Sequence, residues 1–414
     1  MIPIAAIPIS SREALSLTRK LAFGNLFDKS TVTKLENKLA DYVGSKRVLA
    51  CNSGRTALYL AMKALGLDQG HEVIVPAYNC AIVPEMIWRA GLKPVFVDVD
   101  PETCNLDPEL ISKALTSKTR AIVPVHLFGR PCDMDTVVET ADRHGLYVVE
   151  DVAQALGAEY RGRKVGCFGD LAIFSFGPGK SITGGEGGAI AINNTELTEA
   201  VERLQSQLPS PNLRWKLHVA RNVLAMKIFS RHSLYGLVKG SVDSSGERTD
   251  EMIIQNCLTL SKAVSSPLKP SLKPAKMPEV SASVIVKQLQ KLDAFNERRT
   301  INALKLSTLL RAEDENSIQL PKTGSETKNT FTRFPIRILR GNRTLVIKEM
   351  LRRGVDAKEL YYYVADLLRK LARARFPNAE ALSDSLMALP NHPMLTEADL
   401  EEISSSLILS LRAT

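Results

Sequence analysis

The sequence predicts an α/β protein whose first and larger domain is a mostly parallel sheet wrapped by helices. Between Arg47 and Asn193, short β-branched runs alternate with stretches of helical periodicity, which is the pattern of parallel strands joined by crossover helices. At 414 residues, the chain also exceeds what one hydrophobic core usually organises, so we expect a second domain.

Seven short runs in this region are predicted as strands because they are rich in β-branched residues. They are RVLA (47–50), EVIVPA (72–77), KPVFVDV (93–99), RAIVPVHL (120–127), YVVED (147–151), LAIFSF (171–176) and GAIAIN (188–193). The stretches between them have apolar residues at helical spacing, and several end at glycine, as helices commonly do. The predicted helices are 56–67, 83–92, 107–115 and 134–145.

The chain is predicted to divide near residue 278, into a large domain of residues 1–278 and a smaller α+β domain of residues 279–414. The run 281–310 has the pattern of one long amphipathic helix. A last helix is expected to begin at Thr396, whose hydroxyl can cap it, with two acids in its first turn. Residues 265–278, rich in Ser, Pro and Lys, are predicted as a connector.

The net charge of +9 is concentrated in a basic insert at about residues 203–277, which contains twelve Lys or Arg residues and four acidic residues. Residues 213–240 contain no acid, and Leu213, Leu217, Ala220, Leu224 and Ile228 fall at helical spacing. Such a helix can pack on the protein with its charges in water, or it can lie on an anionic membrane surface. We expect no nucleic-acid partner, because no binding motif accompanies the charge.

The six cysteines are scattered, without a C-x-x-C pair, so neither a metal site nor a disulfide framework is expected. The N-terminal residues lack the features of a signal peptide, and no apolar stretch is long enough to span a bilayer. The expected location is the cytoplasm, with a peripheral position at the inner membrane surface as the alternative that the basic insert leaves open.

The segment FSFGPGKSITGGEGG, residues 174–188, carries one lysine on a Gly/Pro turn directly after a predicted strand. A lysine held on such a turn can be presented to a carbonyl group. On this segment alone, an exposed surface lysine is the favoured interpretation of Lys180, because exposed lysines are the common case.

Two further segments point to the same edge of the sheet. Asp151 and Gln154 follow a predicted strand in VVEDVAQALGA, and ligands of open parallel sheets bind at the carboxyl ends of strands. Gly54, Arg55 and Thr56 open a predicted helix after a Ser-Gly turn, so their N–H groups suit a phosphate. The alternatives are that Asp151 caps the next helix and that the Ser-Gly turn is only a turn.

These motifs, in this order, resemble the DegT/DnrJ/StrS sugar aminotransferase family of fold-type-I enzymes, which depend on pyridoxal 5'-phosphate (PLP). The resemblance extends over nearly the whole chain. It includes GHEVIVPAYNCA (70–81), GLKPVFVDVD (91–100), VPVHLFG (123–129), QLQKLDAFNERR (288–299) and ALPNHPMLTEADLEEI (388–403).

The resemblance implies a role for each site residue. Lys180 matches the Schiff-base lysine, and Asp151 matches the partner of the pyridine nitrogen. Gln154 matches the residue near the ring oxygen of the cofactor, and Ser175 matches a hydroxyl on its phosphate. The turn at Gly54, Arg55 and Thr56 matches the phosphate-binding turn.

The chain departs from the family pattern at two places. In VPAYNCA, either Cys80 or Tyr78 takes the position that faces the cofactor ring in relatives, where an aromatic residue is common. In LKPAKMPE, Pro274 stands where the family has an asparagine that reaches the phosphate in the partner subunit. Lys276 occupies the position of the arginine in that family motif.

The resemblance implies an aminotransferase that moves an amino group from an amino acid, usually glutamate, to a nucleotide-linked keto-sugar in polysaccharide or glycan synthesis. It also implies a homodimer with active sites at the subunit interface. Two other functions remain open. Related PLP-dependent sugar dehydratases carry histidine at the lysine position, so Lys180 counts against that reaction, and the other alternative is a non-catalytic regulatory homologue.

Overall fold

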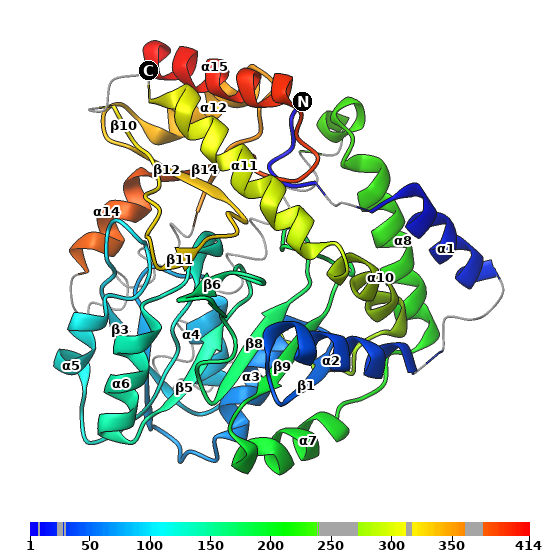
Figure 1. Ribbon diagram of the computed structural model, residues 1–414, viewed down its shortest axis with the longest axis vertical. Helices are drawn as coiled ribbons and strands as arrows, with labels where there is room; N and C mark the ends of the chain where they lie inside the picture. The colour runs from blue at the N-terminus through cyan, green and yellow to red at the C-terminus, as the bar shows by residue number, and fades with distance from the viewer. Residues whose placement is uncertain are drawn as a thin grey trace, which may run out of the picture.

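The computed structural model describes residues 1–6, 9–22, 28, 30–237, 239, 272–311, 317–360 and 376–414. Residues 265–271 of the predicted connector lie outside the described residues. So does the triple tyrosine at residues 361–363, for which packing in the small domain is favoured over lining the substrate cleft. Figure 1 shows a large sheet in one half of the molecule and a smaller group of helices and strands in the other.

The large sheet has seven strands in the order β1-β9-β8-β5-β4-β2-β3, and every strand except β9 runs in the same direction. The strands are β1 (Arg47–Cys51), β2 (Glu72–Pro76), β3 (Lys93–Val97), β4 (Thr119–Ile122), β5 (Tyr147–Asp151), β8 (Leu171–Ser175) and β9 (Gly188–Ile192). Each overlaps one predicted run, although β4 ends at Ile122 whereas the run was predicted to extend to residue 127. The predicted α/β class with a mostly parallel sheet is confirmed.

Helices cover both faces of this sheet. They are α2 (Ser30–Val43), α3 (Gly54–Ala64), α4 (Ile82–Arg89), α5 (Ile111–Ala114), α6 (Met134–His144) and α7 (Thr198–Ser206). Alternate residues of β1 show the two faces: Leu49 packs in the core that includes α3 and α4, whereas Val48 packs in the core that includes α2. This alternation is the period of two that a strand imposes on its side chains.

The smaller half contains an antiparallel sheet in the order β10-β12-β14-β13, packed against three helices. Its strands are β10 (Ile318–Gln319), β12 (Phe334–Ile338), β13 (Lys358–Glu359) and β14 (Leu386–Leu389). The three helices are α11 (Leu292–Leu310), α12 (Arg343–Arg352) and α15 (Glu397–Ala413). Helix α14 (Pro377–Ser385) lies in the same half but buries Ala379 and Leu382 in a core of the large sheet. The N-terminus lies beside α15 (Figure 1), and Ile2 is buried in the same core.

The predicted start of the last helix is confirmed. The hydroxyl of Thr396 accepts the N–H of Asp399 at 3.2 Å, and the Asp399 carboxylate accepts the N–H of Thr396 at 2.7 Å. The two residues therefore form a reciprocal capping box.

The single helix predicted for 281–310 is wrong, because the chain breaks there into α10 (Glu279–Leu289) and α11. The two helices serve different cores: Ile285 of α10 packs with the large sheet, whereas Leu306 of α11 packs with the small one. The side-chain amide of Gln288 accepts the N–H of Thr183 and donates to the carbonyl of Thr183. These two hydrogen bonds fix the end of α10. The division of the chain at residue 278 stays a prediction.

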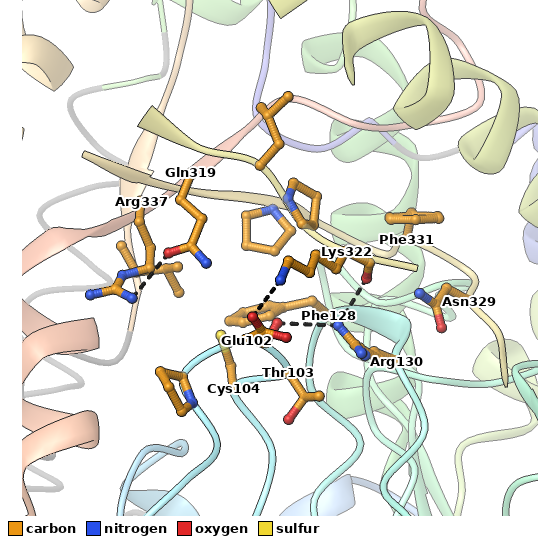
Figure 2. Close-up of a pocket in the computed structure, with 15 residues that line it drawn as sticks. Glu102, Thr103, Cys104, Phe128, Arg130, Gln319, Lys322, Asn329, Phe331 and Arg337 are labelled. Carbon is orange, nitrogen blue, oxygen red and sulfur yellow. Dashed lines mark hydrogen bonds and ion pairs between the residues drawn. The ribbon is translucent and has the colours of Figure 1, made fainter. Parts of the chain in front are cut away.

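The two halves meet along a junction of hydrogen bonds, of which Figure 2 shows the one between Arg130 and Lys322. Gly129 accepts a hydrogen bond from the N–H of Thr330 at 2.9 Å, and Arg130 donates to the carbonyl of Lys322 at 2.8 Å. Strand β11 (Thr327–Lys328) also pairs with β6 (Glu159–Tyr160), which in turn pairs with β7 (Arg163–Lys164). The small domain is thus hydrogen-bonded to the loops at one end of the large sheet.

The acid-free segment forms α8 (Leu213–Phe229), as predicted, but its buried face differs from the predicted apolar stripe. Val219 and Val223 pack in a core shared with α1 (Ser11–Ala22) and α10, whereas Leu217 is 44% exposed. The helix is aligned by its contact with a glycine loop, described below, rather than by its leucines. Among the described helices, none is long and apolar enough to cross a membrane.

Candidate active site

The predicted site residues come from loops at the carboxyl ends of the parallel strands. Strand β5 ends at Asp151, and β8 ends at Ser175 before the turn that carries Lys180. Helix α3 begins at Gly54 beside them. These residues line one cavity of about 320 Å³, so the structure brings together side chains that lie far apart in the sequence.

Lys180 lies on a tight turn of the 177–180 segment. Its N–H donates to the carbonyl of Gly177 at 3.4 Å, and Gly179 has a φ of 75°, which favours glycine. Burial lowers the pKa of the Lys180 amine, and the guanidinium groups of Arg333 and Arg55 lower it further. The Asp151 carboxylate acts in the opposite direction and raises this pKa. A lowered pKa is what an amine needs to act as a nucleophile or base.

Asp151 is almost fully buried in the same cavity. Burial raises the pKa of its carboxyl, while the N–H of Ala153 at 2.9 Å and the charge of Lys180 act in the opposite direction. Because Asp151 accepts the N–H of Ala153, the alternative that it caps the following segment is partly correct. Asp151 nevertheless faces the cavity that contains Lys180.

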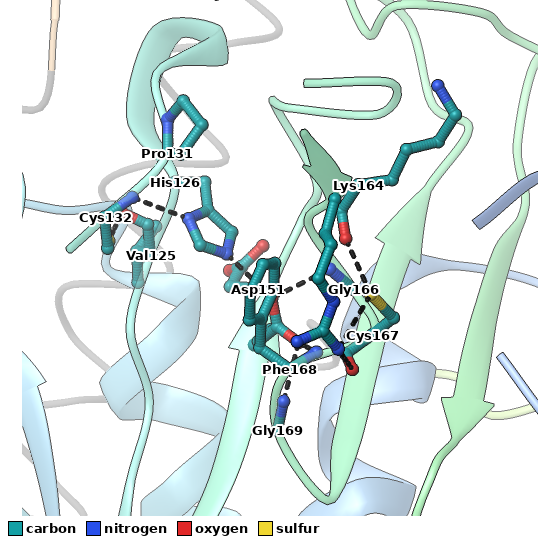
Figure 3. Close-up of polar contacts among 12 residues, drawn as sticks. Val125, His126, Pro131, Cys132, Asp151, Lys164, Gly166, Cys167, Phe168 and Gly169 are labelled. Atoms are coloured by element: carbon teal, nitrogen blue, oxygen red, sulfur yellow. Dashed lines mark hydrogen bonds and ion pairs between the residues drawn. The ribbon is translucent and has the colours of Figure 1, made fainter. Parts of the chain in front are cut away.

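His126 forms part of a buried network beneath Asp151 (Figure 3). Its Nδ1 accepts the N–H of Cys132 at 2.9 Å, so the proton is on Nε2, which lies 3.2 Å from Glu150. The Glu150 carboxylate also accepts the N–H groups of Gly166, Phe168 and Gly169, each at 2.8 Å. The network ties the ends of β4 and β5 together, which gives His126 a structural role.

The start of α3 contributes a close approach of two backbones. A Cβ on Gly54 would lie 2.8 Å from the Cβ of Ser175, so only glycine fits there. Gly54 and Arg55 line the cavity, and the hydroxyl of Ser53 caps the helix by accepting the N–H of Thr56 at 3.2 Å. Thr56 itself is fully buried and does not line the cavity.

Gln154 lies between the cavity and the domain junction. Its Oε1 accepts the N–H of Phe128 at 3.3 Å, and its carbonyl accepts the hydroxyl of Thr332 from the small domain. Gln154 is thus held in place by both domains.

The sequence left open whether Cys80 or Tyr78 faces the cofactor ring, and the structure distinguishes the two. Cys80 lines the cavity. Tyr78 is fully buried outside the cavity lining and donates its hydroxyl to the carbonyl of Leu360 at 2.7 Å. The expectation that Tyr78 contacts the cofactor has no support in this geometry, because its ring faces the core.

Two charged residues near the cavity were missed by the sequence reasoning. Glu186 lines the cavity, and burial raises the pKa of its carboxyl to about 7 against a hydrogen bond from Trp215 of α8. Arg333 comes from the small domain, and a Cβ on Gly179 would lie 2.7 Å from its guanidinium. Glu186 lies close to Lys180 in the sequence, so the sequence could have indicated it as a site residue. Arg333 lies far from Lys180 in the sequence, and only the fold brings it to the cavity.

Helix α8 supports the glycine loop that carries Glu186. A Cβ on Gly185 would lie 2.8 Å from Val223 of α8, so loop and helix are in close contact. Helix α8, the part of the basic insert in contact with this loop, therefore forms part of the wall behind the cavity.

The segment with Pro274 is fixed to the start of α3. The amide of Asn52 donates to the carbonyl of Lys273 at 2.8 Å, and its oxygen accepts the N–H of Ala275 at 3.1 Å. Lys276 bridges to Cys51 through its backbone. The segment thus lies at the edge of the site, although Pro274 stands at the position of the family's asparagine.

Comparison with known families decides the identity of this site. The model of the DegT/DnrJ/EryC1/StrS aminotransferase family matches residues 9–222 and 271–408. The chain belongs to this family. Aminotransferases of the family use PLP, so the protein is a PLP-dependent aminotransferase, as the sequence predicted.

Several characterised family members align over most of the chain. The GDP-perosamine synthase of Caulobacter vibrioides is 31% identical over 383 residues, which cover 91% of this chain and 89% of that protein. The dTDP-3-amino-3,4,6-trideoxy-alpha-D-glucose transaminase of Streptomyces venezuelae is 31% identical and covers 92% and 87%. The solved structure of S. venezuelae DesV is 27% identical, with a TM-score of 0.74 and coverage of 97% and 94%.

The residues of the cavity fit the family's cofactor. The close approach of Gly54 to Ser175 brings the Ser175 hydroxyl beside the positive end of α3, where a phosphate is stabilised. Lys180 and Asp151 provide an amine with a lowered pKa and a buried carboxyl in the same cavity. These are the groups that PLP requires for attachment and for its ring nitrogen.

Proposed function

We propose that the protein transfers an amino group from an amino acid, with glutamate as donor, to the keto group of a nucleotide-linked sugar. The observation that carries the proposal is the cavity in which Lys180 faces Asp151 beside the start of α3. The substrate class is supported by two relatives whose names state nucleotide-linked amino sugars and which align over most of the chain. The product would serve polysaccharide or glycan synthesis.

Each side chain has a separate task in this proposal. The Lys180 amine would hold PLP and would act as the base and acid that moves a proton from and to the donor's α carbon. Asp151 keeps a positive charge on the pyridine nitrogen. Gln154 and Cys80 would hold the ring of the cofactor, and Ser175 with the Gly54–Arg55 turn would bind its phosphate, since all of these residues line the cavity. PLP supplies the protonated ring that stabilises negative charge at the donor's α carbon.

The proposal is tested by the visible absorption spectrum of the purified protein before and after addition of glutamate. We expect an absorption band that shifts on addition of glutamate in the wild type and no such shift in Lys180→Ala. Full turnover by Lys180→Ala would contradict the assignment of this residue. A colourless protein that PLP cannot reconstitute would favour the regulatory alternative.

The dehydratase alternative has one observation against it. The relatives that resemble this family and dehydrate sugars have histidine at the lysine position, whereas this chain has Lys180 with a lowered pKa. Incubation with a nucleotide-linked keto-sugar distinguishes the two reactions: transfer of nitrogen from glutamate supports the proposal, and loss of water from the sugar without nitrogen transfer supports dehydration.

We also infer a homodimer with the sites at its interface, as in the family pattern. Support comes from the segment at Pro274, which is fixed through Asn52 beside the cavity, as a loop that reaches a partner would need to be. Light scattering on the purified protein should give twice the 45.5 kDa mass of the chain. A mass equal to one chain would contradict this inference.

We place the protein in the cytoplasm, and the described cysteines, all free thiols, fit a reducing compartment. Peripheral contact with an acidic membrane is a second proposal, supported by Leu213 and Ile228, which are about half exposed on the acid-free helix α8. Flotation with vesicles should then recover the protein only when acidic lipid is present. Protein that remains unbound with either lipid would rule out the contact.

A further inference from the structure

Glu186 is a charged residue of the Lys180 cavity that has no part in the proposed binding of the cofactor. It lines the cavity of about 320 Å³ together with Lys180 and Asp151. Its Oε1 is buried and has no hydrogen-bond partner among the described residues. A buried polar group in this state costs free energy, which a bound group that donates a hydrogen bond recovers. The wall of the cavity thus contains a carboxyl that a ligand can satisfy.

The glycine loop that carries Glu186 is held on two sides. The N–H of Phe176, directly after β8, donates to the carbonyl of Gly187 at 2.8 Å. On the other side, a Cβ on Gly185 would lie 2.8 Å from Val223 of α8, so the loop cannot shift toward this helix. The backbone of Glu186 is therefore fixed before a ligand binds, and a fixed group binds a ligand with a smaller loss of entropy.

The protonation of Glu186 favours a neutral ligand group. Burial raises the pKa of its carboxyl to about 7, while a hydrogen bond from Trp215 acts in the opposite direction. Near neutral pH the protonated and ionised forms are thus both present. The protonated carboxyl donates and accepts hydrogen bonds, and the ionised form only accepts. A hydroxyl donates and accepts as well, so it can bond to either form.

The molecules of the proposed reaction differ in what they offer to this carboxyl. The phosphate of PLP and the two carboxylates of glutamate are anions, which the ionised form of Glu186 repels. The polar groups of the PLP ring have Asp151 and Gln154 as proposed partners, and the amino group of glutamate must meet Lys180. The hydroxyls of the sugar are the remaining neutral donors, so the sugar is the substrate that fits Glu186.

We propose that Glu186 binds a hydroxyl of the sugar ring and so positions the keto-sugar in the cavity. This inference rests on the proposed transfer to a nucleotide-linked sugar. It assigns Glu186 to the second substrate and not to the cofactor or the amino donor.

Calorimetry on the PLP-loaded enzyme with unreactive nucleotide sugars tests the proposal. The probes are GDP-mannose, dTDP-glucose and UDP-N-acetylglucosamine, which have no keto group and carry the nucleotides that appear in the names of three relatives. Each probe is compared with GDP, dTDP or UDP alone, so the difference in affinity measures what the sugar contributes. We expect at least one probe to bind more tightly than its nucleotide.

Two variants of Glu186 and one control make the result specific. Glu186→Ala should weaken binding of that probe about tenfold or more, but not binding of the nucleotide alone, because only the contact to the sugar is lost. Glu186→Gln keeps an oxygen that accepts a hydrogen bond, so its loss should be smaller. Glu199→Ala, on the exposed face of α7, should bind both ligands as the wild type does. The absorption band of bound PLP shows that each variant is folded and loaded.

Equal losses for the probe and the nucleotide alone in Glu186→Ala would overturn the proposal, because they would indicate a general change of the cavity. Wild-type affinity for the probe in Glu186→Ala, or three probes that bind no better than their nucleotides, would overturn it too. The spectral shift on addition of glutamate tests the proposed transfer separately, since no sugar is present. An enzyme that shows this shift but fails the binding test loses only the role of Glu186.

Discussion

At the scale of single residues, the site depends on charges placed in a partly buried cavity. Lys180 has a lowered pKa because burial penalises its charged form and two guanidinium groups repel it. Asp151 has a raised pKa because burial outweighs its favourable contacts. When PLP is bound, the positive ring nitrogen would offset that burial and keep the carboxyl ionised.

Asp151→Asn preserves the size of the side chain but removes its charge. We expect the rate of amino transfer to fall by about 10²-fold or more, because an amide does not stabilise a protonated ring nitrogen. Steady-state assays and the absorption spectrum of the cofactor would measure this. Asp142→Asn, on the exposed face of α6, is the control, and equal rates for the two variants would contradict the role of Asp151.

Arg333→Gln tests the cause of the low pKa of Lys180. The positive guanidinium disfavours the protonated amine, so its removal should raise the pKa of Lys180. The amine is active when neutral, and its activity is lost as pH falls through its pKa. The acidic limb of the pH–rate profile should therefore move to higher pH, while Arg340→Gln should leave it in place. An unmoved limb in Arg333→Gln would show that Arg333 does not act on Lys180.

At the scale of elements, the phosphate cradle is a contact between the start of α3 and the end of β8. Gly54→Ala would place a Cβ 2.8 Å from the Cβ of Ser175 and force the two elements apart. We expect PLP affinity to drop about tenfold or more and the melting temperature of the apoprotein to fall. Gly236→Ala is the matched control, since a Cβ there meets nothing within 4 Å. Similar losses in both variants would point to a general effect of added side chains.

At the scale of the whole molecule, the junction between domains determines the position of Gln154. Gly129 has a φ of 88°, and a Cβ there would lie 2.4 Å from the hydroxyl of Thr330 and 2.7 Å from the N–H of Phe331. Gly129→Ala should therefore separate the domains and lower both stability and activity. Gly145→Ala has comparable backbone strain at a φ of 62° without a neighbour within 4 Å. If Gly145→Ala lowers the melting temperature as much as Gly129→Ala does, backbone strain rather than the junction explains the loss of stability.

Sequence reasoning predicted the large sheet well because local signals and fold agree there. Each predicted run overlaps a strand, since short β-branched stretches bounded by turns have few alternatives in a parallel sheet. The run 120–127 was predicted too long, because β4 ends at Ile122. It failed at residues 290–291, where periodicity continues but the chain passes from one core to the other. The predicted face of α8 was also shifted, because Val223 contacts Gly185 of a distant loop.

The sequence by itself determined the fold class, the family and the motif residues Lys180, Asp151, Gln154 and Ser175, because each stands at a fixed distance from a strand end. Tertiary structure decided what cannot be read from local spacing. It directed Tyr78 into the core and Cys80 to the cavity, and it brought Arg333 from the small domain to Lys180. The physical reason is that pKa shifts and side-chain directions arise from contacts between segments far apart in the chain, whose positions only packing sets.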